Sequence, residues 1–377
     1  MLPCLKVEDS VGLVVREAVE TLEIAGVAGE VLVVDNGSAD RSADVASLAG
    51  ARVIAEKRPG YGRAIRSGIS AALGPIVVMA DADWTYDMTK LPLLVEPVLR
   101  GEADLAIGSR FNGLSGETMP LLHRYVGTPI LTELIRRAGG QVSVSDSQSG
   151  CRCFRKDAIS GLKLSADGME FASEMLIKGS RHRLRVVDVP TGYRKRIGTS
   201  KLNTFGDGWR HLRMIILLAP ELFFIAPGLL LFLIGAVLSA AALLDSNGIE
   251  VGSLRWQPVF FATIALVLGL QTILVGLVFL WRRAALTGAR IAGFLDFIRA
   301  ASFPPACSII GAALLLAGLA LDAFLLANSV AGRPNLTRQN AIASLAQSLL
   351  LVGGSLASFG LIVTWLHWDE RQKHSLD

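Results

Sequence analysis

Hydrophobic and polar positions follow two different patterns along the chain. Up to about residue 215 the apolar runs are short, as at 31–34 and 76–80, and amphipathic stretches separate them. This alternation predicts buried strands and amphipathic helices in turn, which is an α/β domain. The chain opens on a polar helical pattern at 8–23, so we expect no signal peptide.

Beyond residue 215 the pattern changes to four long apolar segments, at 222–244, 258–281, 304–327 and 341–365. Each is long enough to cross a hydrocarbon core of about 30 Å, which takes about 20 helical residues. Helices of a soluble bundle would keep a polar face, and these four segments have none. The sequence therefore predicts four transmembrane helices.

Residues 205–218 lie between the two patterns. Trp209, Arg210 and Arg213 stand there beside aliphatic residues such as Ile215. An aromatic and basic face next to an apolar face is typical of a helix that lies in the membrane interface. A simple extension of the first transmembrane helix is the alternative.

Basic residues in the loops predict how the chain is oriented. They are concentrated before the first predicted span and between the second and third, and they are sparse in the other two loops. Because positive charge marks the cytoplasmic side, we expect an integral protein of the plasma membrane with its N-terminal domain and both termini in the cytoplasm. The predicted parts are a cytoplasmic α/β domain at 1–204, an interfacial helix at 205–218, four transmembrane helices at 219–368 and a cytoplasmic tail at 369–377.

Composition supports this division of the chain. Of the 377 residues, 51% are hydrophobic and 19% are charged, and the mean hydropathy of +0.48 is too high for an ordinary soluble enzyme. The net charge of +4 is small and no basic patch is concentrated, so we expect no binding to nucleic acid. The four cysteines show no C-x-x-C spacing, which favours reduced thiols over zinc ligands or disulfides.

Polar clusters follow three of the predicted strands. The strand at 31–34 leads into Asp35, the strand at 76–80 into Asp81 and Asp83, and the strand at 104–107 into residues 108–110. In open α/β sheets, ligands bind outside the carboxyl ends of the strands. We therefore expect the three clusters at one edge of the sheet, where they would form a common site.

The sequence Asp81-Ala82-Asp83 is the sharpest chemical signal. Two carboxylates one residue apart, on a turn that leaves a strand, can share a divalent cation and a diphosphate. The cation would neutralise charge on a departing nucleoside diphosphate. Such a turn alone is better explained by solvated acidic residues, but the neighbouring clusters favour a metal site.

Two further turns have candidate roles. Asp35 ends its strand as a carboxylate that can accept hydrogen bonds from a base or a ribose. At 59–63 a glycine-rich turn opens a helix, where the backbone of Gly60 and Gly62 could approach a ligand and Arg63 could meet a phosphate. The glycine pair is a weak signal by itself, and the P-loop pattern is absent.

In combination these motifs resemble glycosyltransferase family 2, and within it the branch of dolichol-phosphate mannose synthases and polyprenyl-phosphate glycosyltransferases. The resemblance covers about residues 1–217. It rests on the segments at 33–40, 60–62, 81–87, 108–111, 119–125, 146–150, 168–174 and 198–202. The second half of the chain is similar to that of family members with C-terminal membrane helices.

The resemblance implies a GT-A fold, a Rossmann-like α/β sandwich, followed by an α-helical transmembrane domain. It implies a magnesium or manganese ion held by Asp81 and Asp83. A nucleotide-sugar donor of the GDP-mannose or UDP-glucose class would be bound by Pro3, Leu5, Asp35, Gly60, Gly62, Asp81, Ala82, Asp83, Arg196, Ser200 and Lys201.

The resemblance also implies how the acceptor is bound. Arg110 and Arg124 would bind the donor diphosphate or the acceptor phosphate and would act with Asp83 in catalysis. Asp146 and Gln148 would line the acceptor side together with Arg124, and a purely structural turn is the alternative for these two residues. The implied acceptor is a polyprenyl phosphate of the dolichyl or undecaprenyl type, in a membrane.

The implied reaction is the inverting transfer of mannose or glucose to that lipid phosphate. A phosphate monoester is largely ionised at neutral pH, so the reaction needs positioning and charge compensation rather than a strong general base. The alternatives are a non-catalytic membrane protein that keeps the fold and a polysaccharide synthase, although the Q-x-x-R-W signature of the latter is absent. The identity of the sugar and the formation of a homo-oligomer stay open.

The chain departs from the family pattern at its start. Family members have a longer first strand, and they favour Asn-Glu where this chain has Lys6 and Val7. We expect the true start to lie upstream of Met1, and a tolerated short strand or lost activity are the alternatives. Thr85 stands where mannose synthases often have a glutamine ligand, so we assign it no role.

Overall fold

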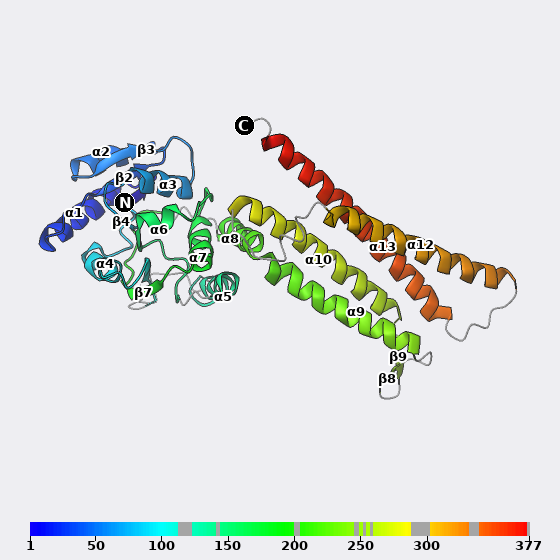
Figure 1. The fold of residues 1–377 in the computed structure, drawn as a ribbon. Coiled ribbons are helices and arrows are strands. Elements are labelled where there is room, and N and C mark those ends of the chain that lie inside the picture. Colours follow the sequence, from blue (N-terminus) through cyan, green and yellow to red (C-terminus); the bar gives the residue numbers. More distant parts are fainter. Residues whose placement is uncertain are drawn as a thin grey trace. The chain divides into compact units, whose positions relative to one another are not determined.

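The computed structural model of the protein describes residues 1–111, 123–140, 144–199, 204–244, 249–251, 254–256, 259–287, 302–331 and 339–374. The chain forms two compact units, Met1–Ala219 and Pro220–Asp377. The first unit holds every described strand except one short hairpin, and the described part of the second is almost entirely helical (Figure 1).

Strands and helices alternate along the first unit, as the hydrophobic pattern predicts. Its strands are β1 (Leu2–Cys4), β2 (Leu32–Asp35), β3 (Arg52–Ala55), β4 (Ile76–Met79), β5 (Leu105–Ser109), β6 (Arg152–Arg155) and β7 (Val186–Pro190). Its helices are α1 (Glu8–Ile24), α2 (Ser42–Leu48), α3 (Tyr61–Ala71), α4 (Leu91–Leu99), α5 (Thr128–Gly139), α6 (Lys156–Ser160), α7 (Phe171–Arg181) and α8 (Thr204–Leu218). The short turns η1 (Met88–Lys90) and η2 (His123–Gly127) precede α4 and α5.

The strands form two sheets that Met1 joins. One sheet has the parallel order β1-β2-β3, and the other has the order β4-β6-β5-β7, in which β6 is antiparallel to both neighbours. The amino nitrogen of Met1 donates to the Val78 carbonyl at 2.8 Å, and the Ala80 nitrogen donates to the Met1 carbonyl at 3.2 Å. β2, β4 and β5 therefore run in one direction, and their carboxyl ends share one edge, as the sequence predicts.

Burial explains why these segments take their structure. All five residues of β5 and three of the four in β2 are buried, which is the near-continuous apolar run of a strand covered on both faces. On α1, Val11, Val14, Val15 and Ala18 recur at the spacing of one helical face and are buried in the same core. This core fixes the strand ends from which the polar clusters emerge.

α8, the helix predicted for the membrane interface, packs on α5 and α7. On one face Ile215 is 0% and His211 is 6% exposed, whereas Trp209 is 61% exposed. The Nδ1 atom of His211 lies 2.7 Å from the hydroxyl of Ser173 on α7. The helix ends at Leu218, and the first candidate membrane span begins at Glu221.

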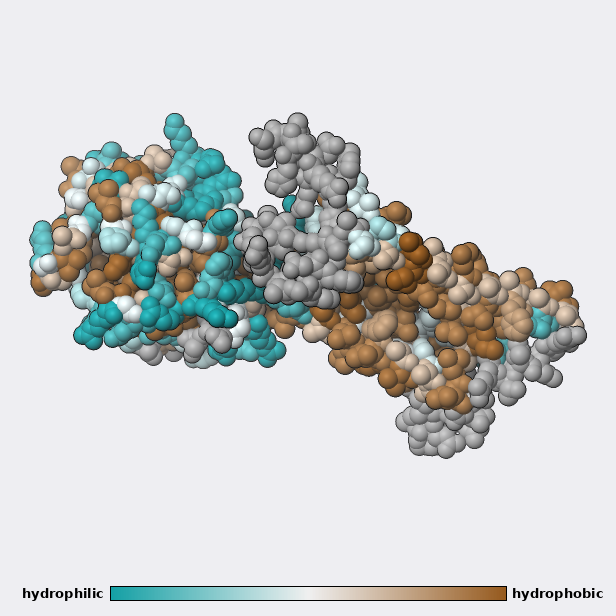
Figure 2. All heavy atoms as spheres, viewed as in Figure 1, coloured by the Kyte–Doolittle hydropathy of each residue, from teal (hydrophilic) through white to brown (hydrophobic). Residues whose placement is uncertain are grey.

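The second unit contains the four long helices that the sequence predicts. Its elements are η3 (Glu221–Ile225), α9 (Ala226–Leu244), the hairpin of β8 (Ile249–Val251) and β9 (Leu254–Trp256), α10 (Val259–Thr287), α12 (Phe303–Val330) and α13 (Gln339–His374). Four stretches are long and apolar enough to cross a membrane, namely Glu221–Leu244, Val259–Arg283, Phe303–Val330 and Gln339–Leu366. Hydrophobic residues dominate the surface of these helices in Figure 2. The predicted fold class is confirmed.

Small residues let the long helices pack closely. A Cβ atom on Gly235 of α9 or Gly269 of α10 would collide with the backbone of the other helix, and α12 approaches α13 in the same way at Gly311. Such close approach at small residues is common between membrane helices. Between α10 and α13, the hydroxyls of Thr263 and Ser344 lie 2.7 Å apart. Backbone contact and interhelical hydrogen bonds therefore join the helices.

The buried His211 predicts how the protein responds to acid. Burial lowers the pKa of His211 to about 4, whereas an unfolded histidine titrates at 6.5. Between these values the unfolded chain binds a proton that the folded protein does not, so the free energy of unfolding falls as the pH falls through this window. His211→Gln is therefore expected to reduce the loss of melting temperature between about pH 7 and about pH 5 in detergent.

His182, which is exposed at the end of α7, provides the control. His182→Gln should keep the acid sensitivity of the wild type. Equal sensitivity in the wild type and His211→Gln would show that burial of His211 does not matter.

Candidate active site

The turn at 81–83 follows β4 and is held firmly. Ala82 is 3% exposed, and its carbonyl accepts a hydrogen bond of 2.8 Å from the Ser10 hydroxyl on α1. Trp84 has a φ of +71°, in the left-handed region that bulky residues rarely adopt. Residues in such conformations persist where the surrounding structure over-determines them, often at functional sites. A freely solvated acidic turn does not describe this segment.

Both oxygens of the Asp83 carboxylate have partners, and the residue is 8% exposed. The Oδ1 atom accepts from the Thr85 hydroxyl at 2.5 Å and from the Thr85 nitrogen at 3.2 Å. The Oδ2 atom pairs with the Arg196 guanidinium at 2.9 Å. Thr85, to which the sequence assigns no role, thus orients Asp83 so that Oδ2 meets Arg196.

Asp81 is held by an aromatic hydroxyl and a glycine. The Tyr61 hydroxyl donates to Oδ1 at 3.0 Å, and a Cβ atom on Gly150 would lie 2.6 Å from Oδ2. Burial and then the charge of Asp83 raise the pKa of Asp81 to about 6, against the opposing effects of Tyr61, Arg196 and Arg110. The two carboxylates therefore repel each other, and a shared cation would relieve that repulsion.

Arg110 follows β5 and is oriented by a buried carboxylate. Its guanidinium binds Asp146 at two points, at 2.6 Å from Nε to Oδ2 and at 2.8 Å from Nη2 to Oδ1. Asp146 is 0% exposed, and the guanidinium carbon of Arg110 lies 5.7 Å from the ring centre of Tyr193. Both oxygens of the Asp146 carboxylate are occupied by Arg110. This placement favours the alternative that Asp146 belongs to a purely structural turn over direct contact between Asp146 and the acceptor.

A second arginine holds the turn that carries Asp146. Arg152 on β6 is completely buried, and its guanidinium donates to the carbonyls of Ser147 at 2.8 Å, Ser149 at 3.0 Å and Ala172 at 2.9 Å. Burial lowers the pKa of Arg152. An uncompensated buried charge is costly, so the folded protein must retain these hydrogen bonds from Arg152 to the carbonyls. They fasten residues 146–150 to β6 and α7.

The residues predicted to border the nucleotide lie at the ends of β1 and β2. Pro3 is in β1, Leu5 follows it, and Asp35 is the last residue of β2. Next to Asp35, the Oδ1 atom of Asn36 accepts from the Gly60 nitrogen at 2.7 Å. This end of the sheet is thereby joined to the glycine-rich turn.

The close approach at the glycine-rich turn is to the protein's own backbone. A Cβ atom on Gly60, whose φ is +145°, would lie 2.5 Å from the Asp167 carbonyl, and one on Gly62 would collide with the Ala166 carbonyl. Arg63 pairs with Asp167 at 2.7 Å. Packing alone therefore requires both glycines, and Arg63 would have to leave Asp167 to meet a phosphate.

The remaining predicted residues are placed only in part. Gln148 lies in the turn with Asp146, and its amide donates to the Ser147 hydroxyl at 3.0 Å. The side chain of Arg124 and the residues Ser200 and Lys201 lie outside the described residues. Their roles stay predictions.

The carboxylates at 81 and 83 fit a divalent cation. Magnesium is typically held by one or two carboxylates, with substrate phosphate oxygens and water as further ligands. Among the residues that the structure describes, no group of three or more His, Cys, Asp or Glu side chains could hold a metal, so phosphate and water would have to complete the ligand set. Burial and, after it, the charge of Asp83 raise the pKa of Asp81, so the two carboxylates are close enough to interact.

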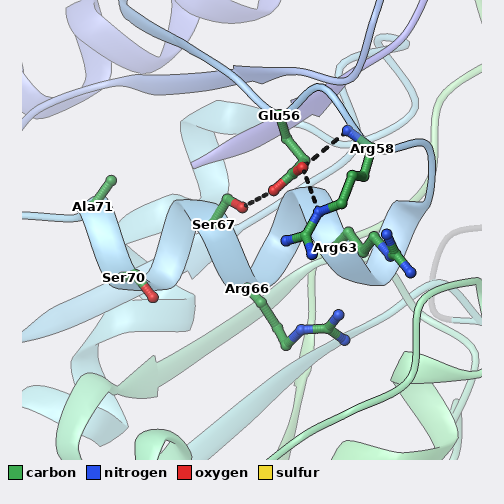
Figure 3. Close-up of a pocket in the computed structure, with 7 residues that line it drawn as sticks. All are labelled: Glu56, Arg58, Arg63, Arg66, Ser67, Ser70 and Ala71. Atoms are coloured by element: carbon green, nitrogen blue, oxygen red, sulfur yellow. Dashed lines mark hydrogen bonds and ion pairs between the residues drawn. The ribbon is translucent and has the colours of Figure 1, made fainter.

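A pocket of about 660 Å³ lies on a different part of the domain, beside α3 (Figure 3). At its centre Glu56 accepts from the Ser67 hydroxyl at 2.6 Å and from the Arg58 Nε at 3.3 Å. Its lining residues are Glu56, Arg58, Arg63, Arg66, Ser67, Ser70 and Ala71. Neither carboxylate of the turn at 81–83 lines this pocket, so the pocket is not the candidate metal site.

Sequence reasoning missed the side chains that orient the site. Tyr61 and Tyr193 are aromatic residues outside the polar clusters, and Arg152 is a charged residue at the start of β6. Arginine is almost never fully buried without partners. The position of Arg152 between Cys151 and Cys153 was therefore the one local signal that this side chain has buried partners. The two tyrosines gave no comparable local signal.

The sheet order, the acidic turn at its edge and the four apolar helices together define a membrane-associated protein with a GT-A domain. Residues 10–162 match the model of glycosyl transferase family 2. The chain belongs to this family, and the predicted family is confirmed.

Curated relatives and solved structures are similar to parts of the chain. A dolichyl-phosphate hexose transferase of Haloferax volcanii is 34% identical over 179 residues, which cover 48% of this chain and 76% of that relative. The low-salt glycan biosynthesis hexosyltransferase Agl6 of the same organism is 39% identical over 258 residues, or 68% of this chain. The match spans only 61% of the length of Agl6. Glucosyl-3-phosphoglycerate synthase from Mycobacterium tuberculosis is similar with a TM-score of 0.48 and 25% identity, over 58% of this chain and 78% of that chain.

The pair of Arg110 and Asp146 gives a prediction for stability. Asp146→Ala would leave the guanidinium of Arg110, whose side chain is 13% exposed, without its carboxylate. Removing one partner of a buried ion pair costs about 3–5 kcal/mol, so we expect a loss of that size in the free energy of unfolding. Chemical denaturation of the purified protein would measure it.

Asp157 on α6 offers the matched control, because its carboxylate pairs with the exposed Arg155. Asp157→Ala should change the free energy of unfolding far less, because solvent screens an exposed ion pair. Equal losses for the two variants would mean that burial adds nothing to the pair of Arg110 and Asp146.

Proposed function

We propose that the protein transfers a hexose from a nucleotide-sugar to a polyprenyl phosphate, with inversion at the anomeric carbon. The observation that carries this proposal is the meeting of Asp81 and Asp83 with Arg110 and Arg196 at one edge of the sheet. The family supports a transfer reaction, and the names of the two Haloferax relatives support a hexose and a dolichyl-phosphate acceptor. The donor belongs to the GDP-mannose or UDP-glucose class.

The chemistry requires one bond to form and one to break. An oxygen of the acceptor phosphate attacks the anomeric carbon, while the bond between that carbon and the nucleoside diphosphate breaks. The nucleoside diphosphate leaves with the electron pair, so an α-linked donor gives a β-linked product. Because the acceptor oxygen is already ionised, no strong general base has to remove a proton.

The protein's part is to bring two anionic partners together. Arg110 offers a guanidinium that Asp146 fixes in advance, and guanidinium groups suit phosphate oxygens. Arg196 adds positive charge at Asp83. A divalent cation held by Asp81 and Asp83 would neutralise charge on the leaving diphosphate. Charges fixed before the reaction stabilise a transition state without reorganisation.

The four long helices suit a lipid acceptor. They would keep the domain at the bilayer, where the phosphate of a polyprenyl lipid is found. The distribution of basic residues supports a cytoplasmic catalytic domain, with both termini on that side of the plasma membrane. Residues 205–218 would then lie near the lipid headgroups, with the exposed Trp209 as an anchor.

Transfer to lipid tests the proposal directly. Membranes that contain the protein would be incubated with polyprenyl phosphate, magnesium and radiolabelled GDP-mannose or UDP-glucose, and chloroform-soluble label would be counted. Wild-type membranes should form labelled lipid with one of the donors. Asp83→Ala should reduce the rate by about 100-fold or more, because charge compensation at the reacting diphosphate is lost.

Asp44, which is exposed on α2, serves as the control. Asp44→Ala should leave the rate unchanged. No labelled lipid with either donor, or full activity of a folded Asp83→Ala variant, would overturn the proposal.

A further inference from the structure

Residues 191–199, which we call the strap, follow β7 and run beside the turn after β4. The Arg194 nitrogen donates to the Thr85 carbonyl at 2.7 Å, and the Ile197 nitrogen donates to the Asp83 carbonyl at 3.1 Å. Between these bonds, the Arg196 side chain pairs with the Asp83 carboxylate at 2.9 Å. The position of Arg196 therefore depends on how firmly the strap is attached to this turn.

The Arg194 side chain makes that attachment. Its guanidinium forms hydrogen bonds of 2.9 to 3.0 Å to the Glu17 carboxylate on α1, and it pairs with Asp87 at 2.6 Å. It also lies 4.7 Å from the ring centre of Trp84, the residue with the left-handed backbone. One cation thus connects α1, the turn after β4 and the strap.

The surroundings distinguish this cluster from an ordinary surface ion pair. The Glu17 carboxylate also accepts from the Met88 nitrogen at 3.0 Å, so it fixes the start of η1 as well. The side chains of Arg194, Glu17 and Asp87 are 29%, 17% and 23% exposed, which limits screening by solvent. A planar guanidinium can bind a carboxylate at two points and stack on an aromatic ring, whereas a lysine ammonium cannot do both.

We propose that Arg194 is a positioning residue of the transfer reaction, which clamps the strap to Glu17 and Asp87 and so sets Arg196 opposite Asp83. The consequence for catalysis rests on the proposed function, whereas the consequence for the strap does not. Loss of the clamp would free the strap and displace Arg196 from the donor side of the site. Arg110, which Asp146 holds, has a separate support.

Two measurements on the full chain in detergent test the clamp. Hydrogen exchange at the amides of Arg194 and Ile197 reports on the strap without any ligand. Steady-state kinetics with GDP-mannose or UDP-glucose separate the KM of the donor from that of polyprenyl phosphate. The variants are Arg194→Met, Arg194→Lys and Glu17→Gln, and the control is Arg185→Met, which removes an exposed arginine paired with Asp104.

We expect faster exchange at both positions in Arg194→Met and Glu17→Gln, and wild-type exchange in Arg185→Met. A displacement of about 1 Å can cost about 100-fold, so kcat/KM for the donor should fall by roughly 10-fold to 100-fold, mainly through KM, with the acceptor KM unchanged. Arg194→Lys should recover part of the loss. Combining Arg194→Met with Glu17→Gln should add little, because both remove one interaction.

A purely structural role would lower the amount of active protein, and hence the apparent kcat, without changing the donor KM. Unchanged exchange, or faster exchange with a wild-type donor KM, would overturn the clamp. If Arg194→Met does not fold, Glu17→Gln decides the question by the same readouts. If the wild type transfers no sugar, the proposed function fails, and the exchange rates alone then decide whether the clamp exists.

Discussion

At the carboxyl end of β4, the side chains around Asp81 and Asp83 are arranged to accommodate two carboxylates that repel each other. Asp81 and Asp83 are separated by one residue at the end of a buried strand, and burial, followed by the charge of Asp83, raises the pKa of Asp81. Neighbouring groups offset this repulsion, since Tyr61 donates to one carboxylate and Arg196 pairs with the other. The left-handed backbone at Trp84 is the conformation in which the turn is held. An arrangement that leaves negative charge partly uncompensated is suited to a cation that arrives with an anionic ligand.

The arginines of the site are held by partners on other elements. Arg110 is bound by Asp146, whose turn is fastened by Arg152, and the strap that carries Arg196 is fastened by Arg194. Each arrangement places a positive charge before any ligand is bound. Fixed charges of this kind are effective in transfer reactions between anions, because little reorganisation is needed when charge moves. In the proposed reaction, such fixed charges would lower the barrier without the help of a strong general base.

Local patterns in the sequence predicted the elements, and the direction of the strands predicted the gathering of Asp81, Asp83 and Arg110. The apolar runs of β2, β4 and the four long helices are signals of length and periodicity that need no knowledge of the fold. The contacts that orient the site depend instead on distant segments. Gly60 lies against the backbone of Asp167, and the buried Asp146 pairs with Arg110, and no local pattern reveals either contact. The hydrophobic periodicity of the sequence could not predict that β6 lies antiparallel between β4 and β5 either, because packing sets the order of the strands.

In the proposed site, the carboxylates of Asp81 and Asp83 share one cation with a nucleoside diphosphate. Anomalous scattering from crystals of the full chain grown with Mn²⁺ and GDP or UDP tests it most directly. We expect one manganese peak between the two side chains and the diphosphate, with metal–oxygen distances of about 2 Å. Bound nucleotide with manganese at another place, or with no metal beside Asp81 and Asp83, would contradict it.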